Sequence, residues 1–425
     1  MNVDDVPPSG GGHQLPILGQ DAPDPWGLPE LPPTTLLGFF EHRVPTADQV
    51  RESLLKALGG AIRFHGEPPD QPEQSLWAMV VEIEGHEMPM VIWTEQVYQE
   101  VMELPACAGS SQGLLGVQSM LDTDDPLATW ERMVRVVGDA VGDVAALVDI
   151  ETEQWFSGEE LATRLLGSEA TSEETMLFRI HVASSVEEPG ESDPVWLRTL
   201  GLHRCGRPEF EMLEVDGAVL PLAHDLLEAV AALCIQRGTP DPGFPFEAGV
   251  NVALSLRTLS EQLELLSPKA VGTRTHREST GGTRADGNPM LHGRAVVCGA
   301  EPRGSFREIF TWPVDAIERL ARGEGGLERT ERWTRSTSFE ARRLWPRLLE
   351  GFRDGRSAQA CIALPVDEGG REQVWIQVDD ASDSELRGTL ISRPAQIDIL
   401  PGDPLVATLD DLIDWRLLEH PNERT

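Results

Sequence analysis

The apolar and polar positions of this chain become regular only after a long N-terminal stretch. Residues 1–34 are rich in proline and glycine and lack a periodic apolar pattern, which predicts a disordered tail. Beyond the run "TTLLGFF", the stretch "VPTADQVRESLLKALGG" places Val50 and Leu54 on one helical face. Thr46 and Gln49 have the spacing of a capping box, and two glycines mark the end of this predicted helix.

Several further elements follow from the same patterns. The apolar runs "SLWAMVVEIEG" and "MPMVIWTE" predict a hairpin, and "PLATWERMVRVVGDAVGDVAALVDIE" predicts a helix that leads into a buried strand. Ser157 and Glu160 give a second capping box. Strands are predicted in "TMLFRIHVAS", "VWLRTLGL" and "PEFEMLEVDG", followed by a helix in "PLAHDLLEAVAALCIQRG" that ends at Gly238. This mixed order indicates an α+β fold and not a doubly wound parallel sheet.

Short strands dominate the C-terminal part of the sequence. "RAVVCG" and "PVDAIERLARG" predict a strand and a helix, and "SFEARRLWPRLLEGF" predicts one further helix. The runs "QACIALPV", "QVWIQVDD", "RGTLISR" and "PLVATL" are separated by Gly, Pro and Asp turns. We therefore expect a small antiparallel barrel or rolled sheet at the C-terminus.

The patterns divide the 425 residues into five segments. We predict a disordered tail over 1–34, an acidic α+β module over 35–270 with 35–168 and 169–270 as candidate subdomains, a flexible loop or linker over 271–293, a connecting strand and helix over 294–338, and a β-rich domain over 339–425. The polar, glycine-containing composition of 271–293 indicates either a linker between domains or a long loop inside one.

Charge changes this picture by indicating a class of partner. The net charge is −36, and residues 1–270 alone hold 14 basic and 45 acidic residues. Such a field attracts a basic protein and repels anionic membranes and nucleic acids, so we expect neither of the latter as a partner. Solubility alone is the alternative explanation of the acidic surface. Residues 271–356 form the one basic region, which can contact a phosphate-bearing partner or dock onto the acidic module of the same chain.

The N-terminus and the cysteines indicate a compartment. The N-terminus has acidic residues where a signal peptide has basic ones, and no run of eighteen apolar residues occurs, so we expect a cytoplasmic protein. Five widely spaced cysteines without a C-x-x-C pair are typical of reduced thiols. No cofactor is predicted.

The strongest candidate for chemistry is "GLHRCGRPEFE". His203 and Cys205 would face one side of an extended segment, and Glu209 and Glu211 would do the same after the turn. Imidazole, thiolate and carboxylates suit zinc, or a Cys–His nucleophile pair, if they converge. The alternative is a hairpin whose turn is bracketed by partly buried side chains. His181 lies between apolar neighbours in a predicted strand and is interpreted mainly as a core histidine.

Two other candidates have structural interpretations. Ser111 in "GSSQG" matches the G-x-S-x-G pattern, but "ELPACA" before it is a poor strand, so a loop is favoured over a nucleophile elbow. His224 lies on the amphipathic helix, where a position near the solvent boundary is expected. The glycine- and arginine-containing stretch "LARGEGGLERTERWTRS" lacks the order of a phosphate-binding loop.

The stretch "GTLISRPAQIDILPGDPLVATLDDLIDW" is interpreted as the closure of the small β domain. Gly402 can supply the positive φ of a turn, Asp403 can bond its turn backbone, and Trp415 can anchor the C-terminal segment. A cation site would use Asp403, Asp410, Asp411 and Asp414, but their spacing is not that of a calcium loop. The structural motif comprises Trp375, Gly388, Pro394, Gly402, Asp403, Asp414 and Trp415.

These motifs also carry a family resemblance. The ordered set "EQVWIQV", "GTLISRP", "LPGDPLV" and "LIDW" resembles the bacterial YegJ-like domain of unknown function, family twenty-three-fourteen, with Gln373 where members often have histidine. Upstream, "LFRIHVAS" and "VWLRTLGLHRCGRPEFEMLEV" are similar to its frequent fusion partner, family forty-twenty-six, with Arg198 and Leu200 at positions where that family has histidines. The resemblance implies a bacterial protein of two modules and no known activity.

No catalytic constellation stands out, so the sequence favours a non-enzymatic interaction protein with an acidic binding surface. An immunity-like or inhibitor-like role is one version of this hypothesis. The alternative is a metal-dependent or Cys/His hydrolase centred on His203 and Cys205.

Overall fold

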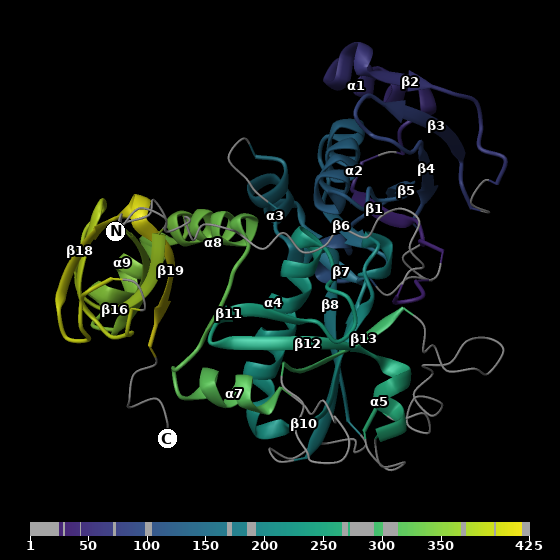
Figure 1. The fold of residues 1–425 in the computed structure, drawn as a ribbon. Helices are drawn as coiled ribbons and strands as arrows, with labels where there is room; N and C mark the ends of the chain where they lie inside the picture. The colour runs from purple at the N-terminus through teal and green to yellow at the C-terminus, as the bar shows by residue number, and fades with distance from the viewer. Residues whose placement is uncertain are drawn as a thin grey trace, which may run out of the picture.

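The computed structural model describes residues 25–28, 30–42, 44–70, 74–97, 104–167, 172–184, 193–265, 271–272, 293–300, 313–366, 371–394 and 397–418. Two seven-stranded sheets form the main body, and a five-stranded antiparallel sheet forms a separate C-terminal unit (Figure 1). Helices and strands both contribute substantially, and the predicted α+β class is confirmed. The predicted tail over 1–34 lies largely outside the described residues, as does most of 271–293.

The first sheet is antiparallel throughout. Its order is β2 (Ile62–Phe64), β3 (Trp77–Ile83), β4 (Met90–Gln96), β5 (Gly113–Ser119), β1 (Thr34–Phe40), β6 (Ala146–Asp149) and β7 (Gln154–Ser157). The β3–β4 hairpin confirms the prediction from the two apolar runs. Helices α1 (Ala47–Leu58) and α2 (Pro126–Val141) pack together, and α2 covers β1 and β5. The capping box of α1 forms as predicted, with Oγ1 of Thr46 accepting from the amide of Gln49.

Helix α2 approaches the sheet very closely at one glycine. A Cβ atom added at Gly38, in the middle of β1, would lie 2.2 Å from Cγ1 of Val137 on α2. Only a residue without a side chain fits there, because heavy atoms do not approach so closely. The helix therefore rests directly on the backbone of the central strand.

The second sheet mixes one parallel pair with antiparallel pairs. Its order is β14 (Gly326–Leu327), β11 (Pro245–Val250), β12 (Val252–Thr258), β13 (Arg294–Gly299), β10 (Glu209–Asp216), β9 (Pro194–Leu200) and β8 (Arg179–Ser184). The parallel pair is β10 with β13, so a strand from the predicted connecting segment 294–338 lies in the centre of this sheet. Helices α4 (Leu220–Arg237) and α7 (Val314–Ala321) pack against the sheet, as does α5 (Leu259–Leu265).

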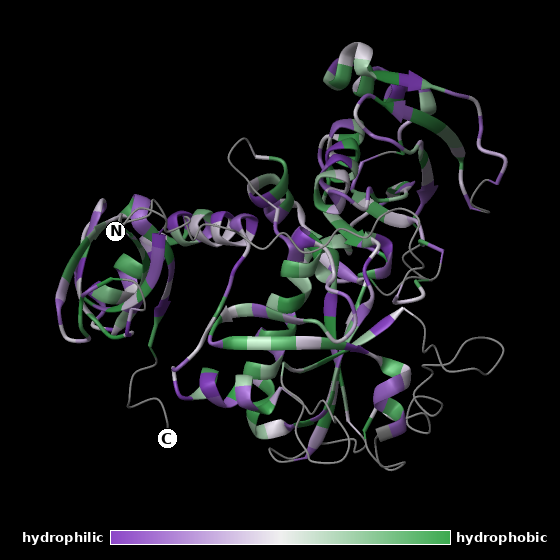
Figure 2. Cartoon of the chain, viewed as in Figure 1, coloured by the Kyte–Doolittle hydropathy of each residue, from purple (hydrophilic) through white to green (hydrophobic). Residues whose placement is uncertain are grey.

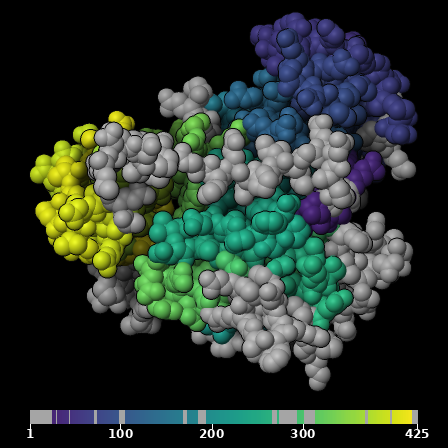
Figure 3. Space-filling model, viewed as in Figure 1, coloured from purple at the N-terminus to yellow at the C-terminus, as the bar shows by residue number. Residues whose placement is uncertain are grey.

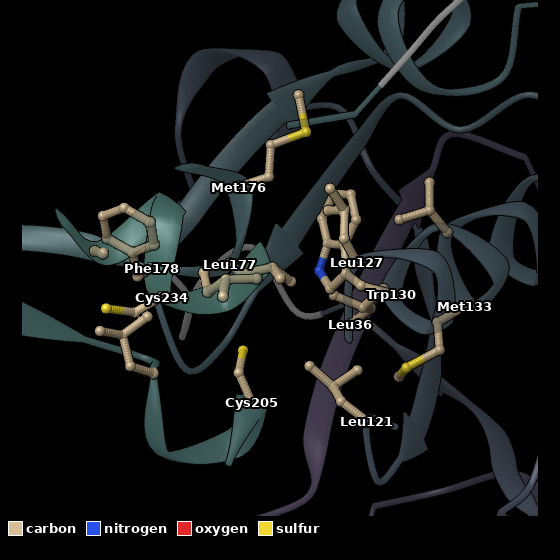
Figure 4. Close-up of a cluster of buried hydrophobic side chains, with 14 of the residues drawn as sticks. Leu36, Leu121, Leu127, Trp130, Met133, Met176, Leu177, Phe178, Cys205 and Cys234 are labelled. Atoms are coloured by element: carbon tan, nitrogen blue, oxygen red, sulfur yellow. The ribbon is translucent and has the colours of Figure 1, made fainter. Parts of the chain in front are cut away.

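Both seven-stranded sheets contribute to one continuous apolar core. Side chains from β1 and α2, such as Leu36 and Trp130, belong to the same buried cluster as Cys205 and Cys234 of the second half of the body (Figure 4). Residues 217–237, which include α4, are long and apolar enough to cross a membrane. Ten side chains of α4 are buried in the protein, and this core position accounts for its apolar composition (Figure 2).

The C-terminal unit is a rolled antiparallel sheet that partly encloses a helix. Its order is β18 (Pro404–Thr408), β17 (Glu385–Leu390), β16 (Arg371–Ala381), β15 (Ala358–Pro365) and β19 (Leu412–Leu417). Helix α9 (Trp345–Arg353) lies within the curve of these strands, and α8 (Glu331–Arg343) contacts β19 (Figure 1). In the space-filling view this unit stands beside the main body (Figure 3). Its core is a second buried cluster around Trp345, Leu348 and Ile376.

The single helix predicted in "SFEARRLWPRLLEGF" is wrong, because the structure has two. Helix α8 ends at Arg343, and α9 begins at Trp345 with Pro346 in its first turn. A proline has no amide hydrogen and its ring clashes with the carbonyl four residues earlier, so it is compatible with the start of a helix but not with its interior. The break follows from Pro346.

Short helical turns complete the described elements. These are η1 (Gly59–Ala61), η2 (Ala106–Ala108), α3 (Gly158–Glu160) with the π-turn η3 (Leu161–Leu165), η4 (Glu174–Leu177), η5 (His203–Cys205), η6 (Gly217–Val219) and η7 (Leu409–Asp411). The capping box of Ser157 and Glu160 forms as predicted at the start of α3.

Candidate functional site

The segment that was expected to hold His203 and Cys205 in an extended conformation forms a tight turn instead. Residues His203–Cys205 make one turn of 3-10 helix between β9 and β10. Gly201 has a φ of +115° and Gly206 a φ of +68°, both in the region that favours glycine, and they fold the chain back on each side of the turn. The period-two argument therefore does not apply to His203 and Cys205, and the expectation of a shared face is wrong for this pair.

Cys205 is a core residue. Its side chain is completely buried, near Leu121 and Leu177 in the apolar cluster (Figure 4), and Sγ lies 3.8 Å from the carbonyl of Gly201. Burial raises the pKa of the Cys205 thiol to about 12. The thiol is therefore protonated at neutral pH and is a poor nucleophile. The ring of His203 is engaged elsewhere, because its Nε2 lies 2.6 Å from the carbonyl oxygen of Gly293.

Glu209 organises the same turn. One carboxylate oxygen accepts from Oγ1 of Thr199 at 2.7 Å, and the other accepts from the amides of Gly201 at 2.9 Å and His203 at 3.3 Å. Three donors therefore converge on this one buried carboxylate. Its contacts are those of a residue that fixes loop geometry.

Glu211 lies on the same face of β10 as Glu209, two residues farther along the strand, and makes a different set of contacts. Its oxygens accept from Nε1 of Trp196 at 2.9 Å and from Nη1 of Arg294 at 2.6 Å. Both partners of the Glu211–Arg294 ion pair are buried, which makes the pair a structural link between β10 and β13. The two glutamates thus bond protein groups, and the four candidates do not converge on one site.

The described residues bring together one group with the geometry of a metal site, and it lies elsewhere. Ligand atoms of His224, Asp225 and Glu228 on α4 lie within 4.8 Å of one another. Burial raises the pKa of Glu228, while the charges of His224 and Arg329 oppose that rise. The guanidinium of Arg329 therefore already supplies a positive charge beside these carboxylates, which disfavours a metal ion there.

The remaining predicted positions have the following environments. His181 is half-buried on β8, and its pKa is lowered by burial and by the charges of Arg198 and Arg179. Ser111 is buried, follows the 3-10 turn η2 and precedes strand β5. The strand–turn–helix arrangement of a nucleophile elbow is therefore absent around Ser111 in the described structure.

The C-terminal motif residues take part in turns and packing. Gly402 has a φ of +101°, and Asp403 accepts from the amide of Leu400 at 2.9 Å. Asp414 accepts from the amide of Trp415 at 2.7 Å, and Nε1 of Trp415 donates to the carbonyl of Ala341 on α8 at 2.9 Å.

Other members of the motif lie on or between the strands of the same sheet. Gly388 lies so close to β16 that a Cβ atom would be 2.3 Å from the carbonyl oxygen of Gln377. The guanidinium of Arg416 stacks on the ring of Trp375 at 4.8 Å. Pro394 lies in the connection between β17 and β18 and not on a strand edge.

A concave site that the sequence did not indicate lies beside the β3–β4 turn. It is a pocket of about 250 Å³. Its lining residues come from the segment before β1, the β3–β4 turn, and the segment from the end of β5 into α2: Leu31, His86, Glu87, Met88, Met120, Leu121, Asp122, Thr123 and Thr129. The signal in the sequence was weak, since "GHEMP" reads as an ordinary hairpin link and its partners are distant in the chain.

His86 has the most perturbed environment in this pocket. Its Nε2 lies 2.9 Å from Oγ of Ser119, and that hydroxyl donates to the carbonyl of Pro89 at 3.2 Å. Nε2 is therefore the donor of the pair, and Nδ1 carries a lone pair. Burial and the charge of Arg132 lower the pKa of His86 to about 4, although Asp122 opposes the shift. Nδ1 is buried and makes no hydrogen bond among the described residues.

Ser119 is not positioned as a nucleophile. Its hydroxyl proton is directed to Pro89, so His86 does not accept it, and the side chain is buried within the first sheet. A general base must be able to accept the proton of the group that it activates. The geometry thus describes a binding pocket with a neutral imidazole.

Comparison with known proteins gives one match. Residues 180–286 match the family model "Protein of unknown function (DUF4026) C-terminal". No curated protein and no solved structure matches the chain significantly. The match supports the predicted resemblance of the central region to family forty-twenty-six, while the YegJ-like resemblance of the C-terminal part stays a prediction. The matched range contains the His203–Glu211 segment and not the His86 pocket.

Proposed function

We propose that this chain is a non-enzymatic protein-interaction module whose acidic surface binds a basic partner protein in the bacterial cytoplasm. The observation that carries the proposal is the charge of residues 1–270, which hold 14 basic and 45 acidic residues. A surface with this imbalance attracts a basic protein and accelerates its approach. An immunity-like or inhibitor-like role against a basic toxin is one version of this function.

Burial changes the charge imbalance at the described surface only slightly. The side chain of Arg204 is completely buried. The guanidinium of Arg207 donates to the backbone carbonyls of Cys234 at 2.9 Å and Thr123 at 3.2 Å. The carboxylates of Asp149, Glu174, Glu209 and Glu211 are buried as well, and the described surface of residues 1–270 stays strongly acidic.

Exposed carboxylates gather on α1 and on the β3–β4 hairpin. They include Asp48, Glu52, Glu82, Glu84 and Glu87. In the described part of residues 30–167, the exposed cations are Lys56, Arg63 and Arg135. The hairpin is thus a compact acidic element at one end of the main body, where a partner can reach it.

Part of the acidic surface is already covered by the chain itself. Arg332 on α8 pairs with Asp125 at 2.8 Å, and Thr330 donates to Glu174 at 2.6 Å. The Arg332–Asp125 ion pair joins the basic region to the acidic module. The same region leaves Arg342, Arg343 and Arg347 exposed. One basic side chain, Arg332, is thus paired with this surface within the molecule, and we infer that a separate basic partner binds it in the same way.

The hydrolase alternative has less support. It required His203 and Cys205 to act together, but Cys205 is buried with a raised pKa and His203 bonds Gly293. Glu209 and Glu211 are engaged by protein donors. We therefore do not propose a reaction at this segment.

A capture experiment tests the interaction role. The immobilised full chain is incubated with bacterial lysate at low salt and at raised salt, and bound proteins are identified by mass spectrometry. The proposal predicts that one basic protein is recovered in an amount comparable to the immobilised chain at low salt. Raised salt should release it, because salt screens exposed ion pairs. The variant Glu82→Gln/Glu84→Gln/Glu87→Gln should bind less of this protein. The control is Asp380→Asn/Asp383→Asn/Asp410→Asn, which changes the charge equally in the C-terminal unit and should bind as much as the wild type. Loss of binding in both variants or in neither would contradict a role of the hairpin.

A further inference from the structure

We propose that the pocket around His86 binds the side chain of a lysine residue of the basic partner. This inference rests on the proposed function and specifies where and how the acidic surface recognises its target. Glu84 and Glu87 belong to the same turn as His86, so the pocket opens within the acidic hairpin surface. Charge complementarity identifies the occupant as cationic.

The size of the pocket indicates a single side chain. Its volume of about 250 Å³ lies below the range of about 300–1,000 Å³ that is usual for small-molecule and cofactor sites. A long side chain that enters from a protein surface needs less room than a free cofactor. Buried anchors of this kind carry much of the binding free energy at protein interfaces.

The lining has the two properties that a lysine side chain requires. Leu31, Met88 and Met120 supply apolar surface for the methylene stem, and the flexible methionine side chains can adjust to it. The carboxylates of Glu87 and Asp122 lie on the same lining and can accept hydrogen bonds from an ammonium group. Met88 is 47% exposed, so a partner can reach its side chain.

The ring of His86 forms part of the pocket wall. Its Nε2 is engaged by Oγ of Ser119 at 2.9 Å and its Nδ1 is buried, so the acceptors open to a ligand are the two carboxylates. An ammonium group has three donors around one nitrogen and can address three separate acceptors, whereas a guanidinium presents a planar fork. The carboxylates of Glu87 and Asp122 can both accept from the single nitrogen of this compact group, which favours lysine in a pocket of about 250 Å³.

One positive charge, that of Arg132, acts on the ring of His86. Arg132 donates to the carbonyl of Gly85, at the base of the same turn, and its charge helps to keep His86 neutral. The carboxylates of Glu87 and Asp122 outnumber this single guanidinium, so the pocket keeps an excess of negative charge.

The test uses the full chain labelled with ¹³C at the methionine methyl groups. The Met88 and Met120 signals are assigned with the variants Met88→Leu and Met120→Leu. The protein is titrated with N-acetyl-lysine methylamide, N-acetyl-norleucine methylamide and N-acetyl-arginine methylamide. We expect saturable shifts of both signals with the lysine compound in the millimolar range. Affinity should be at least about tenfold weaker for norleucine, which lacks the charge, and weaker for arginine.

The variants separate this inference from the proposed function. Glu87→Gln/Asp122→Asn should weaken the lysine compound by about tenfold and leave norleucine unchanged, as expected for the loss of charge-assisted hydrogen bonds. Equal binding of lysine and norleucine, or unchanged Met88 and Met120 signals, would overturn the lysine site. If a basic partner is captured as before by the pocket variant, the inference fails and the interaction role stands. If the lysine compound binds but no partner protein is captured, the lysine site stands and the proposed interaction role fails.

Discussion

Arg204 and Asp149 form an ion pair in which neither side chain is exposed to solvent. Nη1 of Arg204 lies 2.8 Å from Oδ1 of Asp149, and the other carboxylate oxygen accepts from Nε1 of Trp130 at 2.8 Å. The same guanidinium donates to the carbonyl of Leu177 at 3.0 Å. Because Asp149 ends β6 of the first sheet and Arg204 lies in the turn before β10 of the second, the pair joins the two halves of the main body.

Breaking this pair should be costly. Asp149→Asn removes the nearer counter-charge of the buried guanidinium and leaves only Glu151, at 3.5 Å, so we expect a loss of about 3 kcal/mol in the free energy of unfolding. Urea denaturation followed by tryptophan fluorescence measures it. Asp410→Asn, at an exposed site, is the matched control and should change stability by less than about 0.5 kcal/mol. The double variant Asp149→Leu/Arg204→Met, which removes both charges, should recover most of the loss. Similar stability of Asp149→Asn and the control would show that the pair does not hold the sheets together.

Glu151 should make stability depend on pH near neutrality. Burial, together with the nearby Asp149, raises its pKa from the usual 4.5 to about 7, against the opposing effects of the Thr35 amide and Arg204. Between these two pKa values the folded state keeps a proton that the unfolded state loses. The contribution of Glu151 to the free energy of unfolding is therefore present below pH 4.5 and is lost as pH rises through 7. Glu151→Gln should therefore become more stable relative to the wild type as pH increases from 4.5 to 8, by at most about 3 kcal/mol. Unfolding free energies of both proteins across this range give the comparison, and a constant difference would contradict the raised pKa.

The cysteines should differ strongly in reactivity. Burial raises the pKa values of Cys205, Cys234, Cys298 and Cys361 to about 12, whereas Cys107 is partly exposed. Since the thiolate is the reactive form, we expect iodoacetamide at pH 8 to modify the four buried thiols about a thousandfold more slowly than a free cysteine. Peptide mass spectrometry at timed intervals identifies the modified residues. Cys107 should react first in the native protein, and all five should react once urea unfolds the chain. Early labelling of Cys205 would reopen the hydrolase alternative.

His86 should resist protonation. Its pKa of about 4 lies below the usual 6.5. Between pH 4 and pH 6.5, His86 is therefore mostly protonated in the unfolded state and mostly neutral in the folded state. The contribution of His86 to stability is thus complete above pH 6.5 and declines as pH falls toward 4. ¹⁵N NMR of the imidazole should show a neutral ring with its proton on Nε2 down to pH 5. Titration of His86 near pH 6.5 would contradict the buried environment of its ring.

Local elements followed from the sequence because their causes are local. The capping boxes of Thr46 and Ser157 and the β3–β4 hairpin are determined by residues a few positions apart, and all three form. The strands of the C-terminal sheet also lie where their alternating runs and turns placed them. The break at Pro346 could have been predicted in the same way, because a proline in a helix interior is a local conflict.

Tertiary relations were not accessible to the same reasoning. The parallel pairing of Glu209–Glu211 with Arg294–Val296 joins segments more than eighty residues apart, and it gives Glu211 its partner Arg294. The candidate segment contained Arg204, whose role depends on Asp149, but a sequence without contacts cannot show that relation. Positive φ values at Gly201 and Gly206 turned an expected strand into a 3-10 turn.

The His86 pocket illustrates the same limit for function. Its lining joins Leu31, the β3–β4 turn and Asp122, and each of these stretches has an ordinary structural interpretation by itself. Only their convergence creates a cavity with apolar walls and acidic groups. Charge was the one functional signal that the sequence carried by itself, since it does not depend on how the chain folds.

The most direct test of the interaction role is the salt dependence of binding to the captured partner. Dissociation constants are measured by titration calorimetry at several salt concentrations for the wild type, for Glu82→Gln/Glu84→Gln/Glu87→Gln and for the control Asp380→Asn/Asp383→Asn/Asp410→Asn. We predict that affinity falls steeply with salt for the wild type and the control, and that the hairpin variant binds at least about tenfold more weakly at low salt with a shallower dependence. Equal affinity and equal salt dependence for all three proteins would contradict an acidic hairpin that recognises a basic partner.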